Sequence, residues 1–147
     1  MAFGFPRLRR LFNRSTPRLR LHYAPRRNGR PDPGEVVWAW VPFEDDPTQG
    51  KDRPVLVIAC NRTTVIALPL TSKDHDHNSD YEARVGRFWM DIGTGDWDAQ
   101  RRQSEVRLNR ALVLDVKVVR REGGALPKPI FDAVVEAATP YLPTPQS

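Results

Sequence analysis

The chain contains little of what secreted and membrane proteins need. Its 147 residues include one cysteine, Cys60, so no internal disulfide can form, and no Cys-x-x-Cys pair suggests a structural zinc. No run approaches the roughly 18 apolar residues of a membrane span, and the N-terminus lacks the apolar stretch of a secretory signal. We therefore expect a soluble, cytoplasmic protein with no membrane association.

A net positive charge is confined to one segment. The net charge is +5, but residues 1–33 hold nine arginines against one acidic residue, Asp32, which leaves −3 for residues 34–147. Residues 1–33 also contain five prolines and only short apolar pairs, too little apolar surface to offset the entropy cost of ordering. We expect a disordered basic arm there, which serves either solubility alone or attraction to RNA or a membrane surface.

From Gly34 onward, short β-branched runs separated by turn residues predict strands. The expected strands cover residues 35–41, 53–60, 63–70, 81–90, 105–114 and 116–120, with loops at 42–52 and 71–80, a tight turn at Asn61-Arg62 and a short helix or turn at 97–103. After Pro127, apolar residues recur at three- and four-residue spacing, which predicts one amphipathic helix ended by Pro140. The pattern predicts a mainly β fold with one C-terminal helix (α+β) over residues 34–142, a small half-open barrel, followed by a tail at 143–147.

Several motifs of this domain stand in one order along the chain. They are Pro33-Gly34-Glu35-Val36-Val37-Trp38, then Gln49 to Ile58 with Arg53-Pro54 before an apolar run, then Val65 to Ser72 with its Pro-x-Thr-Ser ending, and then Ser104-Glu105-Val106-Arg107. In this order they resemble the PemK/MazF family of toxin ribonucleases over about residues 34–138. The resemblance implies an SH3-like barrel, a homodimer that holds single-stranded RNA between its subunits, and a cognate antitoxin protein whose tail occupies the same groove.

The resemblance assigns the catalytic roles to the residues matched here by Arg53 and Thr71. RNA cleavage without a metal or other cofactor needs an activated 2′-OH, stabilised phosphorane charge and a protonated 5′ leaving oxygen. A guanidinium clamps phosphorane charge well but shuttles protons poorly unless its pKa is perturbed, so we expect Arg53 to act mainly as an electrostatic stabiliser. Thr71 offers a hydroxyl and a backbone N–H to a phosphate oxygen. Without the resemblance, both residues would be ordinary strand ends.

The polar run after Thr71 leaves alternatives open. Ser72 can assist at a phosphate, and in Asp74-His75-Asp76-His77 either histidine can serve as general acid or base, because histidine titrates near neutrality and carboxylates can orient it. The same run fits a metal site or a plain solvated loop. The residues we expect to contact RNA are Gln49, Ser72, Lys73, His75, His77, Trp97 and Arg107.

Two of those residues have competing interpretations. Trp97, flanked by Asp96 and Asp98, is the tryptophan we expect to be exposed and to stack on an unpaired base. Arg107 is either a second phosphate contact or the partner of a nearby acid.

The overall charge of the domain leaves a rival function open. The acidic balance of residues 34–147 opposes an RNA-binding role, unless Arg53, Arg107 and Arg110 converge on one face or the arm supplies the charge. The rival class is a catalytically inactive barrel that binds nucleic acid or a partner peptide without cleavage.

Overall fold

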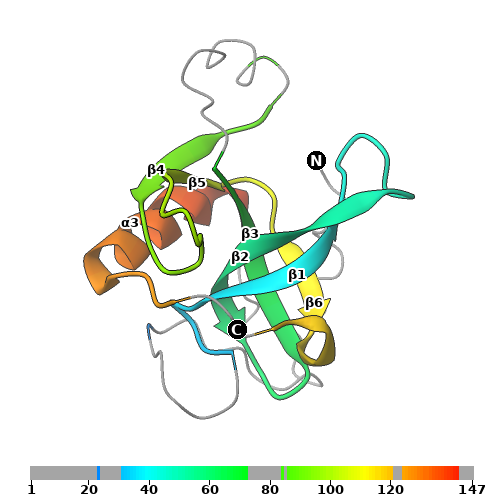
Figure 1. The fold of residues 1–147 in the computed structure, drawn as a ribbon, viewed down its shortest axis with the longest axis horizontal. Helices are drawn as coiled ribbons and strands as arrows, with labels where there is room; N and C mark the ends of the chain where they lie inside the picture. The colour runs from blue at the N-terminus through cyan, green and yellow to red at the C-terminus, as the bar shows by residue number, and fades with distance from the viewer. Residues whose placement is uncertain (1–22, 24–30, 73–83, 85, 121–123, 143–147) are drawn as a thin grey trace.

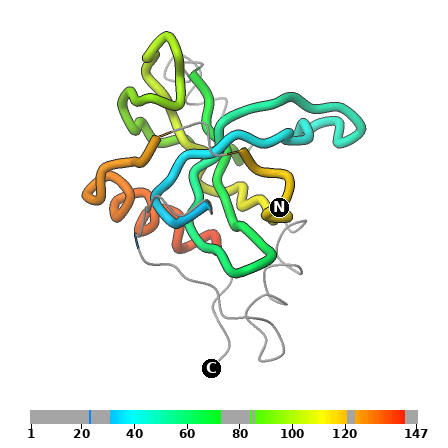
Figure 2. The backbone as a smooth tube through the Cα atoms, turned by 60° about the horizontal axis from the view of Figure 1, so that its bottom comes forward, coloured from blue at the N-terminus to red at the C-terminus, as the bar shows by residue number. Residues whose placement is uncertain are grey.

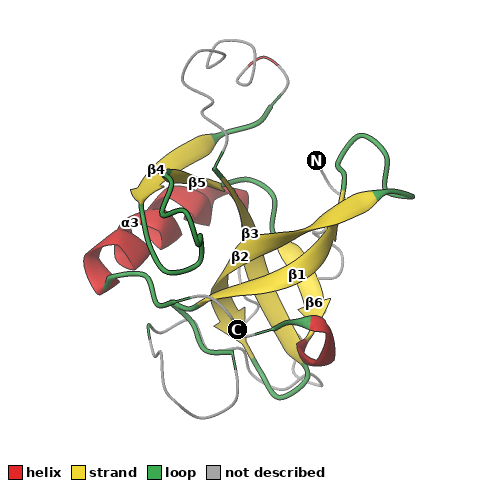
Figure 3. Cartoon of the chain, in the orientation of Figure 1, coloured by secondary structure: helices red, strands yellow, loops and turns green. Residues whose placement is uncertain are grey.

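The computed structural model describes Tyr23 and residues 31–72, 84, 86–120 and 124–142 (Figures 1 and 3). No helix within these ranges is long and apolar enough to cross a membrane. The elements follow in the order β1 (Val36–Pro42), β2 (Gly50–Cys60), β3 (Thr64–Thr71), β4 (Trp89–Gly93), β5 (Ser104–Arg107), β6 (Leu112–Asp115), the 3-10 helix η2 (Val116–Val118), α3 (Lys128–Ala138) and the 3-10 helix η3 (Thr139–Tyr141).

The strands form an antiparallel sheet in the order β1-β2-β3-β5-β4, and β6 also pairs with β3. β3 therefore runs through the middle, with β2 along one edge and β6 and β5 in succession along the other. Beyond η2 the chain returns to β1 through a bridge between Trp38 and Arg120. The sheet thus curls back toward its own first strand (Figure 1).

Both faces of the sheet are covered by apolar side chains, because successive residues of a strand point to opposite faces. One cluster fills the concave side of the curl and consists of Val37, Val41, Val55, Val57, Cys60, Val65 and Ala67, with Leu112 and Leu114 of β6 against it. A second cluster joins the other face to α3 through Val36, Leu56, Ile58, Leu68, Phe131, Val134 and Ala138, among others. This double coverage explains why β2 is continuously apolar and buried from Val55 to Cys60.

The predicted elements hold best where the apolar pattern is strongest. The strands at 35–41, 53–60 and 63–70, the turn after Cys60 and the helix after Pro127 are confirmed, although β2 begins earlier, at Gly50. The strand predicted over 116–120 is wrong. There the Asp115 carboxylate accepts a hydrogen bond of 2.8 Å from the Lys117 backbone N–H and caps the turn η2.

The region from β4 to β6 also differs from the prediction. The single strand expected over 105–114 is two strands, β5 and β6, separated by residues 108–111 and both paired with β3. The strand expected over 81–90 begins at Trp89, and residues 81–83 and 85 lie outside the described residues.

Packed structure begins before Gly34, which corrects part of the prediction of a disordered arm over 1–33. The Tyr23 hydroxyl donates a hydrogen bond of 2.7 Å to the Leu126 carbonyl, and its ring lies 5.4 Å from the ring of Phe131. Asp32 is fully buried. Gly34 has a φ of +100°, and a Cβ there would stand 2.5 Å from the Tyr23 ring, so both backbone and space require glycine. Residues 1–22 and 24–30 lie outside the described residues.

Candidate active site

The central cleft arises where two paired strands separate. The pairing of β2 with β3 ends at Val55 and Pro69, and continuing that register by two residues places Arg53 opposite Thr71. There β2 follows β1, with Arg53 against Ala39, while Thr71 pairs with Glu105 of β5. The β1–β2 ribbon projects from the rest of the sheet (Figures 1 and 2), and Arg53 and Thr71 both line the gap between the separated strands.

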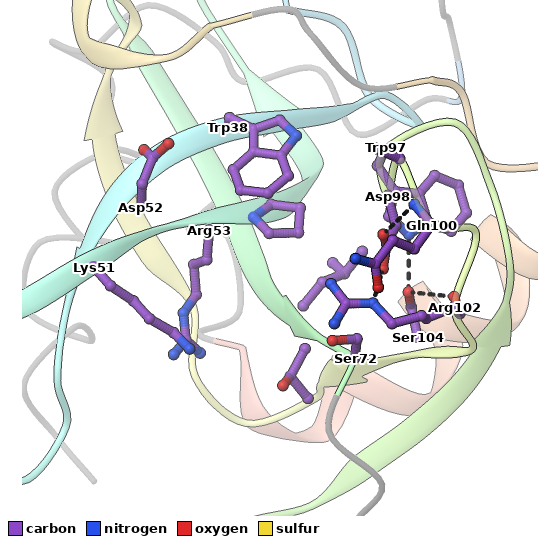
Figure 4. Close-up of a pocket in the computed structure, with 14 residues that line it drawn as sticks. Trp38, Lys51, Asp52, Arg53, Ser72, Trp97, Asp98, Gln100, Arg102 and Ser104 are labelled. Atoms are coloured by element: carbon purple, nitrogen blue, oxygen red, sulfur yellow. Dashed lines mark hydrogen bonds and ion pairs between the residues drawn. The ribbon is translucent and has the colours of Figure 1, made fainter.

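This gap is a cleft of about 360 Å³. It is lined by Trp38, Lys51, Asp52, Arg53, Pro54, Leu70, Thr71, Ser72, Trp97, Asp98, Ala99, Gln100, Arg102 and Ser104. Figure 4 shows Lys51 and Arg53 on one wall, Gln100 and Arg102 on the other, and Ser72 between them. The structure therefore brings together three of the candidate site residues, Arg53, Thr71 and Ser72.

Arg53 is the guanidinium best prepared to bind an anion. Burial lowers its pKa from the ordinary arginine value, and its Nε is buried with no hydrogen-bond partner among the described residues. No carboxylate among the described residues forms an ion pair with Arg53. The adjacent Asp52 pairs with Arg120 instead. A desolvated cation without a counter-ion gains most from a phosphate, which can accept two hydrogen bonds from the guanidinium.

Arg107 is part of an ion pair and not of the cleft wall. Its side chain is 4% exposed and donates two hydrogen bonds, of 2.8 and 3.0 Å, to the carboxylate of Glu44. Its guanidinium carbon lies 5.8 Å from the centre of the Trp89 ring. Of the two interpretations from sequence, the structure displays the salt bridge to an acid.

Glu44 is the counter-ion of several arginines. Burial would raise its pKa, but the hydrogen bond from Arg107 and the charges of Arg107, Arg110 and Arg87 outweigh burial and hold the pKa below its ordinary value. Arg87 donates to Glu44 at 3.2 Å and to Asp45 at 2.8 Å. The ionised form of the carboxylate is thus favoured.

Arg110 connects this cluster with the cleft. It donates a hydrogen bond of 2.6 Å to the Pro42 carbonyl. Burial lowers the pKa of Arg110, and the charges of Arg107, Arg53 and Arg87 lower it further against the opposing effect of Glu44. These four arginines therefore converge on one side of the fold with Glu44 and Asp45 as their acids.

The other wall is the turn between β4 and β5, and its tryptophan corrects a prediction. Trp97 is 3% exposed, and its Nε1 donates a hydrogen bond of 2.9 Å to the Ser104 hydroxyl. The flanking Asp96 and Asp98 suggested exposure, but only the Asp96 carboxylate is exposed, where it pairs with Arg101, while Asp98 pairs with Arg102 at the cleft and the indole folds inward. Trp97 therefore supports the cleft as a buried residue and does not offer an exposed stacking face.

Comparison with known proteins decides the family. The profile of PemK-like, MazF-like toxins of type II toxin–antitoxin systems matches residues 32–142. The chain belongs to this family. MazE-MazF (Form-II) from Deinococcus radiodurans superposes with a TM-score of 0.52 at 18% identity, covering 77% of this chain and 96% of that one, which shows a shared fold. Mycobacterium tuberculosis toxin MazF-mt6 gives a TM-score of 0.48 at 19% identity, covering 75% and 99%. A comparison with curated protein sequences gives no match.

Of the four other residues predicted to contact RNA in this MazF-like chain, the structure describes one. Gln49 is exposed in the β1–β2 loop, outside the cleft lining, and its backbone N–H donates to Asp46. Lys73, His75 and His77 lie outside the described residues.

Sequence reasoning missed Gln100 and Arg102 of the cleft lining. No motif marks the two turn residues, because only the fold of the turn brings them to the cleft.

Proposed function

We propose that the chain is the endoribonuclease toxin of a bacterial type II toxin–antitoxin system. It cleaves single-stranded RNA without a metal, by attack of the 2′-OH on the adjacent phosphate, and leaves a 2′,3′-cyclic phosphate and a 5′-OH. The observation that supports this most is the desolvated Arg53, without a described acidic partner, opposite Thr71 across an open cleft. Family membership supports the same conclusion, since these toxins are typically endoribonucleases.

The chemistry follows from that pair. A phosphodiester between Arg53 and Thr71 receives two guanidinium hydrogen bonds on one side and the Thr71 hydroxyl on the other. As the 2′-oxygen loses its proton and bonds to phosphorus, negative charge grows on the non-bridging oxygens, where Arg53 stabilises it. The P–O5′ bond then breaks and the 5′-oxygen takes up a proton. Burial lowers the pKa of Arg53 and so makes proton donation easier, but its main role stays electrostatic.

The partners belong to the same proposal. We interpret the curled sheet as an SH3-like half-open barrel that pairs as a homodimer and holds RNA in the groove between subunits. The fold shared with MazE-MazF from Deinococcus radiodurans supports a cognate antitoxin that occupies the cleft. His75 and His77 are candidates for the general base or acid, and neither group needs a metal for that role.

The test compares wild type, Arg53→Ala and a control, Arg62→Ala, for growth after induction and for cleavage of single-stranded RNA with mapped 5′ ends. Arg62 is exposed in the turn at the opposite end of β2. We expect growth arrest and chelator-resistant cleavage from wild type and Arg62→Ala, and a loss of roughly 100-fold or more for Arg53→Ala.

Three results would contradict the proposal. Full activity of Arg53→Ala would show that Arg53 is not the catalytic residue. Loss of cleavage in chelator would favour a metal nuclease built on His75 and His77. Binding of varied single-stranded RNAs without cleavage would favour an inactive barrel.

A further inference from the structure

A second arginine faces the cleft from the wall opposite Arg53. Arg102 lies in the turn between β4 and β5 and lines the cleft together with Thr71 and Ser72. In Figure 4 its side chain extends from the turn toward the space above Ser72, whereas Arg53 enters from β2. Two cations on opposite walls leave room for an anionic chain between them.

Asp98 fixes the orientation of Arg102. The Nε of Arg102 donates a hydrogen bond of 2.8 Å to Asp98 Oδ2, and the other carboxylate oxygen accepts one of 2.9 Å from the Gln100 backbone N–H. The Asp98 side chain is 10% exposed and that of Arg102 56%. The carboxylate is therefore packed beneath the guanidinium, whose terminal nitrogens have no acceptor among the described residues.

The backbone of this turn is fixed as well. Arg101 has a φ of 50°, a conformation that non-glycine residues adopt rarely and that persists only where surrounding contacts hold it. Its N–H donates to the Asp98 carbonyl at 2.8 Å, and the Ser104 hydroxyl donates to the Arg102 carbonyl at 3.3 Å. Arg102 is thus presented to the cleft by a turn whose backbone is held by these contacts.

We propose that Arg102 is a phosphate-binding residue of the cleft and that Asp98 is its positioning residue. Asp98 engages Nε, so the two terminal nitrogens remain to bind two oxygens of one RNA phosphate, the geometry in which arginine binds phosphate best. Arg102 holds the backbone from the wall opposite Arg53 and sets the path of the strand past Thr71. This inference rests on the proposed function and deepens it.

The neighbouring ion pair shows what a purely structural contact in this turn is like. Arg101 donates to Asp96 at 2.6 Å, both side chains are exposed, and neither residue lines the cleft. Arg101→Gln therefore removes the same charge one residue away and serves as the matched control for Arg102→Gln.

The experiment measures binding of the full chain to a 2′-O-methyl oligonucleotide, which cannot be cleaved, over a range of salt, and cleavage of the matching RNA. Arg102→Gln should weaken binding about tenfold or more, and reduce the slope of log K against log salt by about 0.7, the value for one phosphate contact on a single strand. Arg101→Gln should change neither. Asp98→Asn should raise KM while keeping most of the salt slope, because the charge remains but its orientation is lost.

The outcomes separate this inference from the proposed function. If wild type cleaves RNA, Arg53→Ala does not, and Arg102→Gln behaves as Arg101→Gln, then Arg102 has no such role and the ribonuclease assignment stands. If wild type neither binds nor cleaves RNA, both fall. Should Arg102→Gln fail to fold, Arg102→Lys takes its place, because it keeps the charge beside Asp98. Arg102→Lys should bind the oligonucleotide more weakly than its control, Arg101→Lys. Equal affinities of the two lysine variants would overturn the proposal.

Discussion

Arg107 of β5 donates two hydrogen bonds to the carboxylate of Glu44, which lies 63 residues earlier, in the loop between β1 and β2. Because Arg107 is almost fully buried, this pair fastens the β1–β2 ribbon to the far side of the sheet. Arg53 stands on the same ribbon, so the position of the catalytic candidate depends on the ion pair. A buried guanidinium that loses its carboxylate keeps its full desolvation cost.

Glu44→Gln should therefore destabilise the fold. The amide keeps the shape but accepts only through one oxygen and carries no charge, and we expect a loss of about 1–3 kcal/mol, moderated by the partial exposure of Glu44. Urea unfolding at neutral pH measures it. Asp45→Asn is the control, because Asp45 pairs with Arg87 but is 82% exposed, and it should cost at most about 0.5 kcal/mol. Equal effects of the two variants would show that the buried pair is not the important contact.

The same pair predicts how stability depends on pH. The pKa of Glu44 lies below its ordinary value of 4.5, since burial, which raises it, is outweighed by the arginines. A lowered pKa in the folded state contributes stability above the ordinary value and loses it as the pH falls through the lowered one. The difference in unfolding free energy between wild type and Glu44→Gln should thus shrink as the pH falls below 4.5. A difference that stays constant down to strongly acidic pH would contradict this explanation.

The opposition of Arg53 and Thr71 shows what a sequence can and cannot supply. Both strands were predictable, and family order pointed to both residues. However, Cys60 pairs with Val65 beside the turn, and if that register continued along both strands, Arg53 would lie opposite Ser72. An irregularity between Val57 and Ala59 shifts the register by one residue and brings Thr71 into place. Nothing in the apolar run marks that position.

The turn before β5 was predicted, but the burial of its tryptophan was not, for a related reason. Flanking aspartates suggested that Trp97 is exposed, but the direction of the indole depends on the backbone of the turn, including the positive φ of Arg101. Charged neighbours indicate that an aromatic side chain is exposed only where the chain does not reverse its direction at that residue. Arg102 and Glu44 carry no motif either, since each gains its role from a partner placed by the fold.

Gly95→Ala tests whether that turn supports the cleft. A Cβ at Gly95 would stand 2.1 Å from the Trp97 ring, so the indole or the turn must move. We expect a loss of about 1–3 kcal/mol of stability, with lower RNA cleavage in the fraction that remains folded. Gly124→Ala is the control and should cost less, because its Cβ would stand 3.3 Å from that of Asp96, which needs a shift of only a few tenths of an ångström. Unchanged unfolding of Gly95→Ala would mean that the turn has more freedom than its contacts indicate.

Tyr23 should stabilise the domain although it lies in the basic segment. Tyr23→Phe removes the hydrogen bond to Leu126 and should cost about 1 kcal/mol, whereas Tyr23→Ala also removes the packing on Phe131 and should cost about 2–4 kcal/mol. Thermal and urea unfolding of the full chain measure both. If Tyr23→Ala unfolds like wild type, the contact adds nothing in solution and the domain begins at residue 31 or later.

Truncation can then separate the charge of the arm from its anchor. Residues 1–22 carry six arginines and no acidic residue, and cutting before Tyr23 keeps the contact with Leu126. Because affinity for single strands falls with salt by about 0.7 per neutralised phosphate, deletion of 1–22 should weaken binding to the 2′-O-methyl oligonucleotide and flatten its salt dependence, while unfolding stays unchanged. Replacing those six arginines by glutamine in the full-length chain should reproduce the result if charge is the cause. An unchanged salt slope in both variants would leave RNA attraction to the arginines around Arg53 alone.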